Sequence, residues 1–520
     1  MKSALRALPL VLAIAAAPVA SAAAQRASRD LAEAQHTLAL FELELDVVDL
    51  FLAMSDSIRA RPLMIRNVNV VDMARGRMLS GMRVSVSGGR ITSIERDPGG
   101  TSPAGIATVN GRGKFLMPGL ADMHVHQLTS AAQHLLHVAT GVTTVRDMVG
   151  FPWLLHWRDR TARDGWLAPT MYVAGPIIGA ARMGMYADVV GSEVEARRAV
   201  REHHAAGYNF VKVHNALPRP LFLAVTDEAR KVGVPVVGHV PHRISVADAM
   251  QAGMITLEHL KGYIDDRTLT IAKDDWMTPT RTSEVWNTPT LYTKRLFLTP
   301  AEARSWASLP EALYTPLIER RRWLADVVQP PAIGATLDDK QREIIKRLLP
   351  VTTRFLAGTD AGGGYPFMVN GFALHEELRL LNEAGLSILE ALRAATLYPA
   401  RAVGREKEFG QVAVGMRADL LLLDGNPLES LDALDGRSGV AVRGRWMDGE
   451  KLRRLLDRLA GIYATEPAAA ARGFTPDSAW IAGIDDRMRG ARDRGYVFPA
   501  HHIRNVNQAL AAFGMVNVLR

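Results

Sequence analysis

Between residues 115 and 360, short apolar runs alternate with longer segments of helical periodicity. One of these longer segments, SEVEARRAVREHHAAG, ends on Gly207, and glycine commonly terminates a helix. Strands that are separated by helices pair in parallel, because each helix carries the chain back to the start of the next strand. Eight such runs predict an α/β fold, a (β/α)8 TIM-like barrel. The runs are FLMPGLADMHVH, TTVRDM, TMYVAG, FVKVH, VVGHV, TLEHL, WNTPTLY and FLAGTD.

Short β-rich segments precede and follow this region. From Met64, MIRNVNVVDMARGRMLSGMRVSVSGGRITSIER contains apolar runs that are separated by glycine and polar turns. From Phe409, FGQVAVGMRADLLLLDGNPL and GVAVRGRWMDGE return to the same pattern. We expect residues 61–114 and 408–448 to pair as a small β-sandwich domain, and residues 115–407 to form the barrel.

The two ends of the chain differ from this pattern. Residues 1–24 have a basic start (Lys2 and Arg6), a short apolar run and small residues around Ala22, which together are typical of a secretory signal peptide. This leader predicts a periplasmic or secreted protein, with an uncleaved N-terminal anchor as the alternative. Residues 25–60 fit both strand alternation and a helical stripe, and we favour a helical extension. Residues 449–520 form a tail, part helical and part irregular.

Composition excludes several classes of protein. The 520 residues include no cysteine, so neither disulfides nor thiolate zinc sites are expected. The formal charge of +8 is not arranged as a basic stripe interleaved with aromatic residues, so we expect no nucleic-acid partner. After the leader, no segment is apolar and long enough to predict stable membrane insertion. A homo-oligomer is left open.

Residues that commonly bind metals lie at or near the ends of five of the eight runs. In a β/α barrel the active site lies at the C-terminal ends of the strands, so side chains from these ends converge on one cavity. A single histidine in a strand is usually a hydrogen-bonded core residue, and the alignment of all six positions is what predicts a metal centre. They are His124 and His126 on the first run, Lys212 on the fourth, His239 on the fifth, His259 on the sixth and Asp360 on the eighth.

These elements resemble the amidohydrolase superfamily, in particular its imidazolonepropionase-like enzymes and metal-dependent Xaa-Pro or Xaa-Arg dipeptidases. The resemblance extends from about Met64 to about Leu452 and leaves out the leader, the segment that follows it and the tail. The matching stretches are PGLADMHVH, GVTTVRDM, VKVH, GHV, LEH, LAGTDAG, HEELRLLNEAGLSILEALRAATLYPAR and GMRADLLLLDGNPL.

The resemblance implies a role for each of these residues. His124, His126 and Asp360 would hold one metal ion, and His239 and His259 a second. Lys212 would be carboxylated and bridge the two ions, so the expected cofactor is Zn²⁺, two per chain. The alternative is an unmodified Lys212 and one ion. Asp360 would also be the catalytic group, taking a proton from the attacking water and passing it to the leaving nitrogen.

Three further residues are candidates for substrate binding. Arg146 follows the second run and could bind a substrate carboxylate in a bidentate manner, or could form an internal salt bridge. His214 and Tyr263 come just after strands that carry ligands, where they could line the pocket or support the ligands from behind.

The leading functional hypothesis is an exported, metal-dependent hydrolase of an amide bond in a small-molecule or short-peptide substrate, with a dipeptidase as the best single choice. The alternative substrates are a cyclic amide, an amidated toxin, an ester or a lactone, because the same activated water would attack all of them. A metal-binding protein without turnover is the hypothesis from another class. The presence of Asp360 argues against it, because a protein that only binds metal needs no catalytic base.

Overall fold

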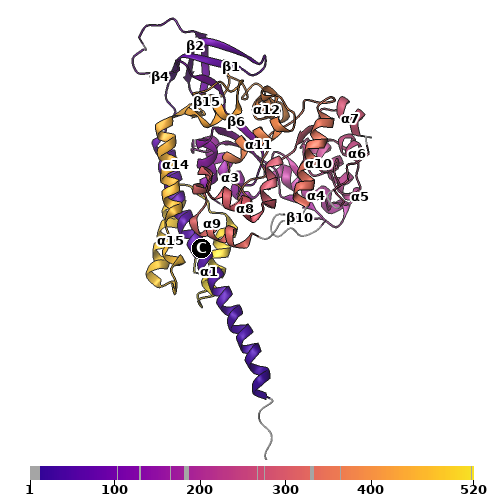
Figure 1. The fold of residues 1–520 in the computed structure, drawn as a ribbon, viewed down its shortest axis with the longest axis vertical. Coiled ribbons are helices and arrows are strands. Elements are labelled where there is room, and N and C mark those ends of the chain that lie inside the picture. Colours follow the sequence, from indigo (N-terminus) through magenta and orange to yellow (C-terminus); the bar gives the residue numbers. More distant parts are fainter. Residues whose placement is uncertain are drawn as a thin grey trace, which may run out of the picture.

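The computed structural model describes residues 12–101, 103–127, 130–163, 165–180, 187–265, 268–273, 276–327, 333–363, 365–516 and 518–519. Much of the predicted leader, residues 1–11, lies outside the described residues. The protein has a β domain at one end, a mixed α/β body and a layer of long helices along one side (Figure 1). None of the described helices is long and apolar enough to cross a membrane.

The two flanking segments pair in one continuous sheet. Its strands run in the order β17–β16–β15–β5–β1–β2–β3, with β4 paired to β1. The junction between the segments is the antiparallel pair of β5 and β15. The strands are β1 (Leu63–Asp72), β2 (Arg77–Ser87), β3 (Arg90–Arg96), β4 (Ala107–Asn110), β5 (Phe115–Pro118), β15 (Leu420–Leu423), β16 (Arg437–Val442) and β17 (Arg445–Asp448).

This sheet and the strand that leaves it differ from the sequence prediction, which expects a sandwich and an undivided first run. All of its strands share one hydrogen-bonded sheet, whose register shifts in β1 and β2 and which encloses a core that includes Ile65, Val84 and Leu420. The run FLMPGLADMHVH is also not one strand, because it divides at Gly119 into β5 and β6. A Cβ at Gly119 would lie 2.3 Å from Thr143 Oγ1, so this crossing point between the two domains has room only for glycine.

The body contains parallel strands at the predicted runs. The first seven runs each include a strand, and all pairings among the body strands are parallel. They form a three-stranded sheet, β6–β7–β8, and a six-stranded sheet, β10–β9–β11–β12–β13–β14. The strands are β6 (Leu120–Val125), β7 (Val142–Asp147), β8 (Thr170–Val173), β9 (Ile177–Gly179), β10 (Ala187–Val189), β11 (Val211–Val213), β12 (Val236–Gly238), β13 (Met254–Glu258) and β14 (Trp286–Thr288).

The eighth run, FLAGTD, pairs with its neighbours only through single bridges. Phe355 bridges to Asn287 of β14, and Ala361 bridges to Val125 of β6. A third bridge, from Ala174 to Phe210, links the end of β8 to the residue before β11. These bridges connect the three-stranded sheet to the six-stranded one on both sides, and they place the residues around Asp360 beside β6.

Helices surround the body strands. α4 begins after its N-cap Ser192 and ends at Gly207, as the sequence predicts. α12 begins after Ser387, whose side chain accepts a hydrogen bond from the Glu390 N–H, while the Glu390 carboxylate binds Arg393 and Tyr398. The helices are α2 (Ala132–Ala139), α3 (Pro152–Arg163), α4 (Glu193–Ala206), α5 (Arg219–Val232), α6 (Val246–Ala252), α7 (Met277–Thr282), α8 (Pro300–Trp306), α9 (Leu317–Asp326), α10 (Ile333–Leu348), α11 (Phe372–Glu383), α12 (Ile388–Ala394) and α13 (Leu397–Ala402).

The segment that follows the leader and the tail pack against each other. α1 (Leu12–Ser57) contacts α14 (Gly449–Ala464), α15 (Ser478–Asp493) and α16 (Ala500–Ala511), and these helices lie side by side in Figure 1. Arg487 of α15 pairs with Asp46 and Asp49 of α1, at 2.7 and 2.6 Å. The acidic residues that interrupt the apolar stripe of α1 therefore bind the tail.

Glu44 joins this helical layer to the body. Its Oε1 accepts hydrogen bonds from the backbone N–H of Ala131, at 2.9 Å, and from the Tyr496 hydroxyl, at 3.4 Å. Ala131 precedes α2, which follows the strand that carries His124 and His126. Burial raises the pKa of Glu44 from 4.5 to about 7, although its hydrogen bonds oppose the shift.

We expect the free energy of unfolding of Glu44→Gln, relative to that of the wild type, to increase as the pH rises. The folded-state pKa lies above the unfolded-state value, so the stability that the protonated carboxyl contributes is fully present below about pH 4.5 and is lost as the pH rises to about 7. Glutamine has no such loss. Relative to the wild type, the free energy of unfolding of the variant should therefore increase by about 3 kcal/mol between pH 4.5 and 8.

Denaturant unfolding at several pH values measures this difference. Glu33→Gln is the matched control, because it makes the same change at an exposed position of the same helix. A difference between Glu44→Gln and the wild type that does not vary with pH would contradict the prediction.

Candidate metal centre

Asp360 meets both histidines of the first body strand. His126 Nε2 lies 2.8 Å and His124 Nε2 3.3 Å from Asp360 Oδ1. Burial alone would raise the pKa of Asp360, but the imidazoles of His259, His124 and His126 hold it well below its usual range. The first and eighth runs therefore supply three adjoining ligand-type side chains, as the sequence predicts.

His259 and His239 continue the cluster. The ring centroids of His124 and His259 are 4.6 Å apart, and those of His239 and His259 are 4.7 Å apart. One nitrogen each of His124 and His259 and one oxygen of Asp360 lie within 4.8 Å of one another, which is close enough to share an ion. Burial holds the pKa values of His239 and His259 well below 6.5, so both rings are neutral and can donate a lone pair.

Lys212 lies buried beside these histidines. It is 2 % exposed, and burial lowers its pKa from 10.5 to about 8 despite the opposing charges of Glu258 and Asp360. Gly238 makes room for its side chain, since a Cβ there would lie 3.0 Å from Lys212 Cδ and 2.2 Å from Val213 O. The structure thus brings all six predicted residues into one region at the C-terminal ends of the body strands.

The backbone is strained where it presents two of these side chains. His259 and Asp360 have φ angles of +59° and +62°, in the left-handed region that residues other than glycine rarely adopt. Asp122 holds the second of these turns, because its carboxylate accepts hydrogen bonds from the hydroxyl and the N–H of Thr359, at 2.7 and 3.1 Å. Thr290, also left-handed at +53°, contacts His259 Nδ1 at 2.6 Å. Strain of this kind concentrates at functional sites.

Glu258 is the functional residue that the sequence analysis missed. Its side chain is fully buried, with Oε2 2.7 Å from His124 Nδ1 and Oε1 2.7 Å from Arg146 Nη2. Burial opposes ionisation, but the Arg146 guanidinium and His124 hold the pKa of Glu258 below its usual range. The signal in the sequence was a carboxylate within the apolar run TLEHL, directly before a ligand.

Of the two alternatives for Arg146, substrate binding and an internal salt bridge, the structure shows the salt bridge. It is 1 % exposed, and its guanidinium donates to Glu258, to Met123 O at 2.6 Å and to Thr256 Oγ1 at 3.0 Å. A substrate carboxylate could reach it only by displacing these acceptors. Arg146 therefore acts on the centre through Glu258.

The other two candidates for substrate binding have different surroundings. Tyr263 is fully buried, donates to Asn287 Oδ1 at 2.9 Å and packs edge-on against Trp276, so it supports β14 from behind. His214 is partly exposed and lies with its ring centroid 4.2 Å from that of His239. Of the three candidates, only His214 lies at the border between the ligand cluster and solvent.

The donor set fits a divalent metal ion. Glu258 engages His124 Nδ1, which leaves Nε2 facing Asp360, and this buried nitrogen makes no hydrogen bond within the described part of the chain. Neutral imidazoles and a carboxylate are the ligands that zinc and similar ions prefer. A carboxylate that orients a ligating histidine from behind is also typical of such sites.

Comparison with known proteins agrees with this geometry. The model of the Amidohydrolase family matches residues 115–483. The chain belongs to the amidohydrolase family. It is thus a hydrolase of the superfamily that acts on carbon–nitrogen bonds.

Amidohydrolases of known structure share the fold. Bottromycin amidohydrolase is 26% identical with a TM-score of 0.65, and the match covers 82% of this chain and 96% of that one. A prolidase-like protein from Bifidobacterium longum is 25% identical with a TM-score of 0.61, over 77% of this chain and 99% of that one. These neighbours imply a TIM-barrel-like fold with an additional domain.

A sequence relative covers much less of the chain. Adenine deaminase from Cenarchaeum symbiosum (strain A) is 35% identical over 105 residues, which are 19% of this chain and 17% of that protein. The chain therefore spans only about a sixth of the length of this relative.

We expect Glu258→Gln to weaken metal binding and to destabilise the fold. His124 loses the carboxylate that fixes its orientation, so metal affinity, measured by competition with a chelator, should fall by about 10–100-fold. Arg146 remains buried and charged without its anion, so the free energy of unfolding of the apoprotein should fall by about 3–5 kcal/mol.

The double variant Glu258→Gln/Arg146→Met separates these two effects. Removing the stranded cation should restore much of the apoprotein stability but not the metal affinity. An unchanged metal affinity in Glu258→Gln would show that this carboxylate does not orient His124.

Proposed function

We propose that this amidohydrolase is a metal-dependent hydrolase of an amide bond in a peptide-like substrate. The observation that carries the proposal is the arrangement of four imidazoles, a buried lysine and Asp360 around one point at the strand ends. In this proposal the parallel strands and residues 355–361 close into an eight-stranded barrel. The single bridges from Phe355 and Ala361 support that closure.

His124, His126 and Asp360 would hold one metal ion, and His239 and His259 a second. Lys212 would bridge them as a carbamate, and its burial favours the neutral amine that reacts with CO2. Zn²⁺ is the proposed ion, because imidazole and oxygen ligands suit it. When bound, such ions polarise the scissile carbonyl group and make water a stronger acid.

Asp360 would move the proton in this reaction. Its Oδ1 is committed to His126 and His124, so the other carboxylate oxygen can accept a proton from the attacking water and deliver it to the leaving nitrogen. The pKa of Asp360 lies well below its usual range, so its carboxylate is ionised at neutral pH. Glu258 and Arg146 would hold His124 in place throughout.

A dipeptidase-like activity is the finer proposal. The similarity to a prolidase-like protein and to bottromycin amidohydrolase supports peptide-like amides as the first substrates to test. Cyclic amides, amidated toxins, esters and lactones remain in the same panel, because the same water would attack them.

The experiment compares Asp360→Asn with the wild type on that panel, with kcat and metal content measured on the same samples. Asparagine keeps the size of the side chain and one acceptor oxygen but cannot take the proton. We expect kcat to fall at least about a hundredfold while most of the metal is retained. Asp159→Asn, at a half-exposed position of α3, is the control and should leave kcat unchanged.

Two results would contradict this mechanism. A loss of kcat only in proportion to lost metal would make Asp360 a ligand without a role in proton transfer. No turnover of any amide by the metal-loaded wild type would contradict the proposed function as a whole.

The leader supports a second proposal, that the protein is exported. Mass spectrometry of the N-terminus should then find mature protein that begins near Ala23 or Gln25. In the full-length chain, these two residues lie within α1. Active protein that retains Met1 in the cytosol would contradict export.

A further inference from the structure

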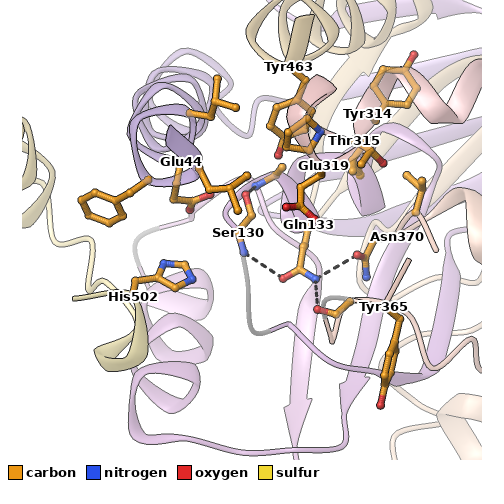
Figure 2. Close-up of a pocket in the computed structure, with 18 of the residues that line it drawn as sticks. Glu44, Ser130, Gln133, Tyr314, Thr315, Glu319, Tyr365, Asn370, Tyr463 and His502 are labelled. Atoms are coloured by element: carbon orange, nitrogen blue, oxygen red, sulfur yellow. Dashed lines mark hydrogen bonds between the residues drawn. The ribbon is translucent and has the colours of Figure 1, made fainter. Parts of the chain in front are cut away.

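A cavity of about 440 Å³ lies between the helical layer and the body. α1, α14 and α16 supply one wall, and the opposite wall comes from α9, the start of α2 and residues 362 and 365–370 (Figure 2). Its size is within the usual range of small-molecule sites. Of the three helices in this wall, α1 and α16 lie outside residues 115–483, the part that matches the family model, while α14 lies within it.

One side chain connects the cavity to the metal centre. Gln133 lines the cavity, and its Nε2 donates to His126 O at 3.2 Å, to Gly362 O at 3.1 Å and to Asn370 Oδ1 at 3.1 Å. Figure 2 shows Gln133 at the base of the cavity, with Ser130 and Asn370 on either side. His126 is a ligand-type residue and Gly362 is two residues from Asp360, so the cavity adjoins the backbone that carries both.

The lining of the cavity is apolar and aromatic with few charges. Leu40, Trp323, Met368 and Tyr314 are among its lining residues, and no lysine or arginine lines it within the described residues. Two carboxylates reach it, but burial raises the pKa of Glu44 to about 7 and Glu319 contacts His36. His501 and His502 also line the cavity, and burial lowers the pKa of His502 to about 3, so its ring is neutral. An additional anion would therefore find no lysine or arginine here.

We propose that this cavity is a specificity pocket that binds an uncharged, bulky apolar group of the substrate, such as an aromatic side chain beside the scissile amide. That the bound group belongs to a substrate rests on the proposed function, whereas its uncharged, apolar character rests on the cavity alone. It follows that the free carboxylate of a dipeptide, where the substrate has one, has to bind outside this pocket.

The test measures binding directly on the metal-loaded full chain, so that it does not depend on turnover. The probes are 4-phenyl-1-butanol and 4-phenylbutane-1-sulfonate, which share one skeleton and cannot be hydrolysed, with dissociation constants from NMR titration. We expect the alcohol to bind the wild type at least about fivefold more tightly than the sulfonate, because no lysine or arginine lines the cavity within the described residues.

Leu40→Trp fills the cavity from α1 and should weaken binding of the alcohol at least about fivefold. Leu31→Trp is the matched control, because it makes the same change at an exposed position of α1 that does not line the cavity. It should change the affinity by less than about twofold. If Leu40→Trp does not fold, Leu40→Ala takes its place, and its loss of apolar wall should weaken binding about threefold.

Equal affinity of the alcohol for the wild type and the folded Leu40 variant would overturn the pocket, and so would a sulfonate that binds as tightly as the alcohol. The substrate panel then tells the two proposals apart. If the probes bind as expected but no amide is hydrolysed, the proposed function is overturned and the pocket stands. If Leu40→Trp slows the hydrolysis of small and bulky substrates equally, the pocket alone is overturned.

Discussion

The buried carboxylate of Glu258 joins the two parallel sheets of the body through side-chain contacts. It lies at the end of β13 in the six-stranded sheet and binds His124 of β6 and Arg146 of β7, which belong to the three-stranded sheet. A buried charge is tolerated only with close partners, so this contact fixes the positions of the strands as well as the charge. The imidazole of His124 can face Asp360 only while the contact holds.

A second set of contacts places the helical layer over the centre. Glu44 of α1 accepts the N–H of Ala131 at the start of α2, and Tyr496 of the tail contacts the same oxygen. Segments that are far apart in the sequence thereby enclose the cavity beside His126. Their contacts with each other and with the body give α1 and the tail a structural reason to lie together. The proposed substrate pocket gives them a functional one.

The sequence predicted which ligand-type side chains lie together, because each of them follows a local pattern, one or two polar residues at the end of an apolar strand. It also located seven body strands and the helical character of residues 25–60. It could not predict the pairing of Glu258 with Arg146, since the two residues are separated by 112 positions and a salt bridge has no local pattern. The division of the first run at Gly119 and the contacts of α1 with the tail likewise depend on tertiary packing. The eighth run lies where the sequence predicts it, between β14 and β6, but it forms single bridges and not a regular strand.

Anomalous diffraction from crystals of the purified protein, measured at the absorption edge of its metal, locates the bound ions directly. We expect a peak within about 2.0–2.2 Å of His124 Nε2 and His126 Nε2 and beside Asp360, with a second peak beside His239 and His259 if Lys212 bridges two ions. If crystals of zinc-saturated protein show no peak among these residues, or show one only elsewhere on the chain, these residues do not form the metal centre.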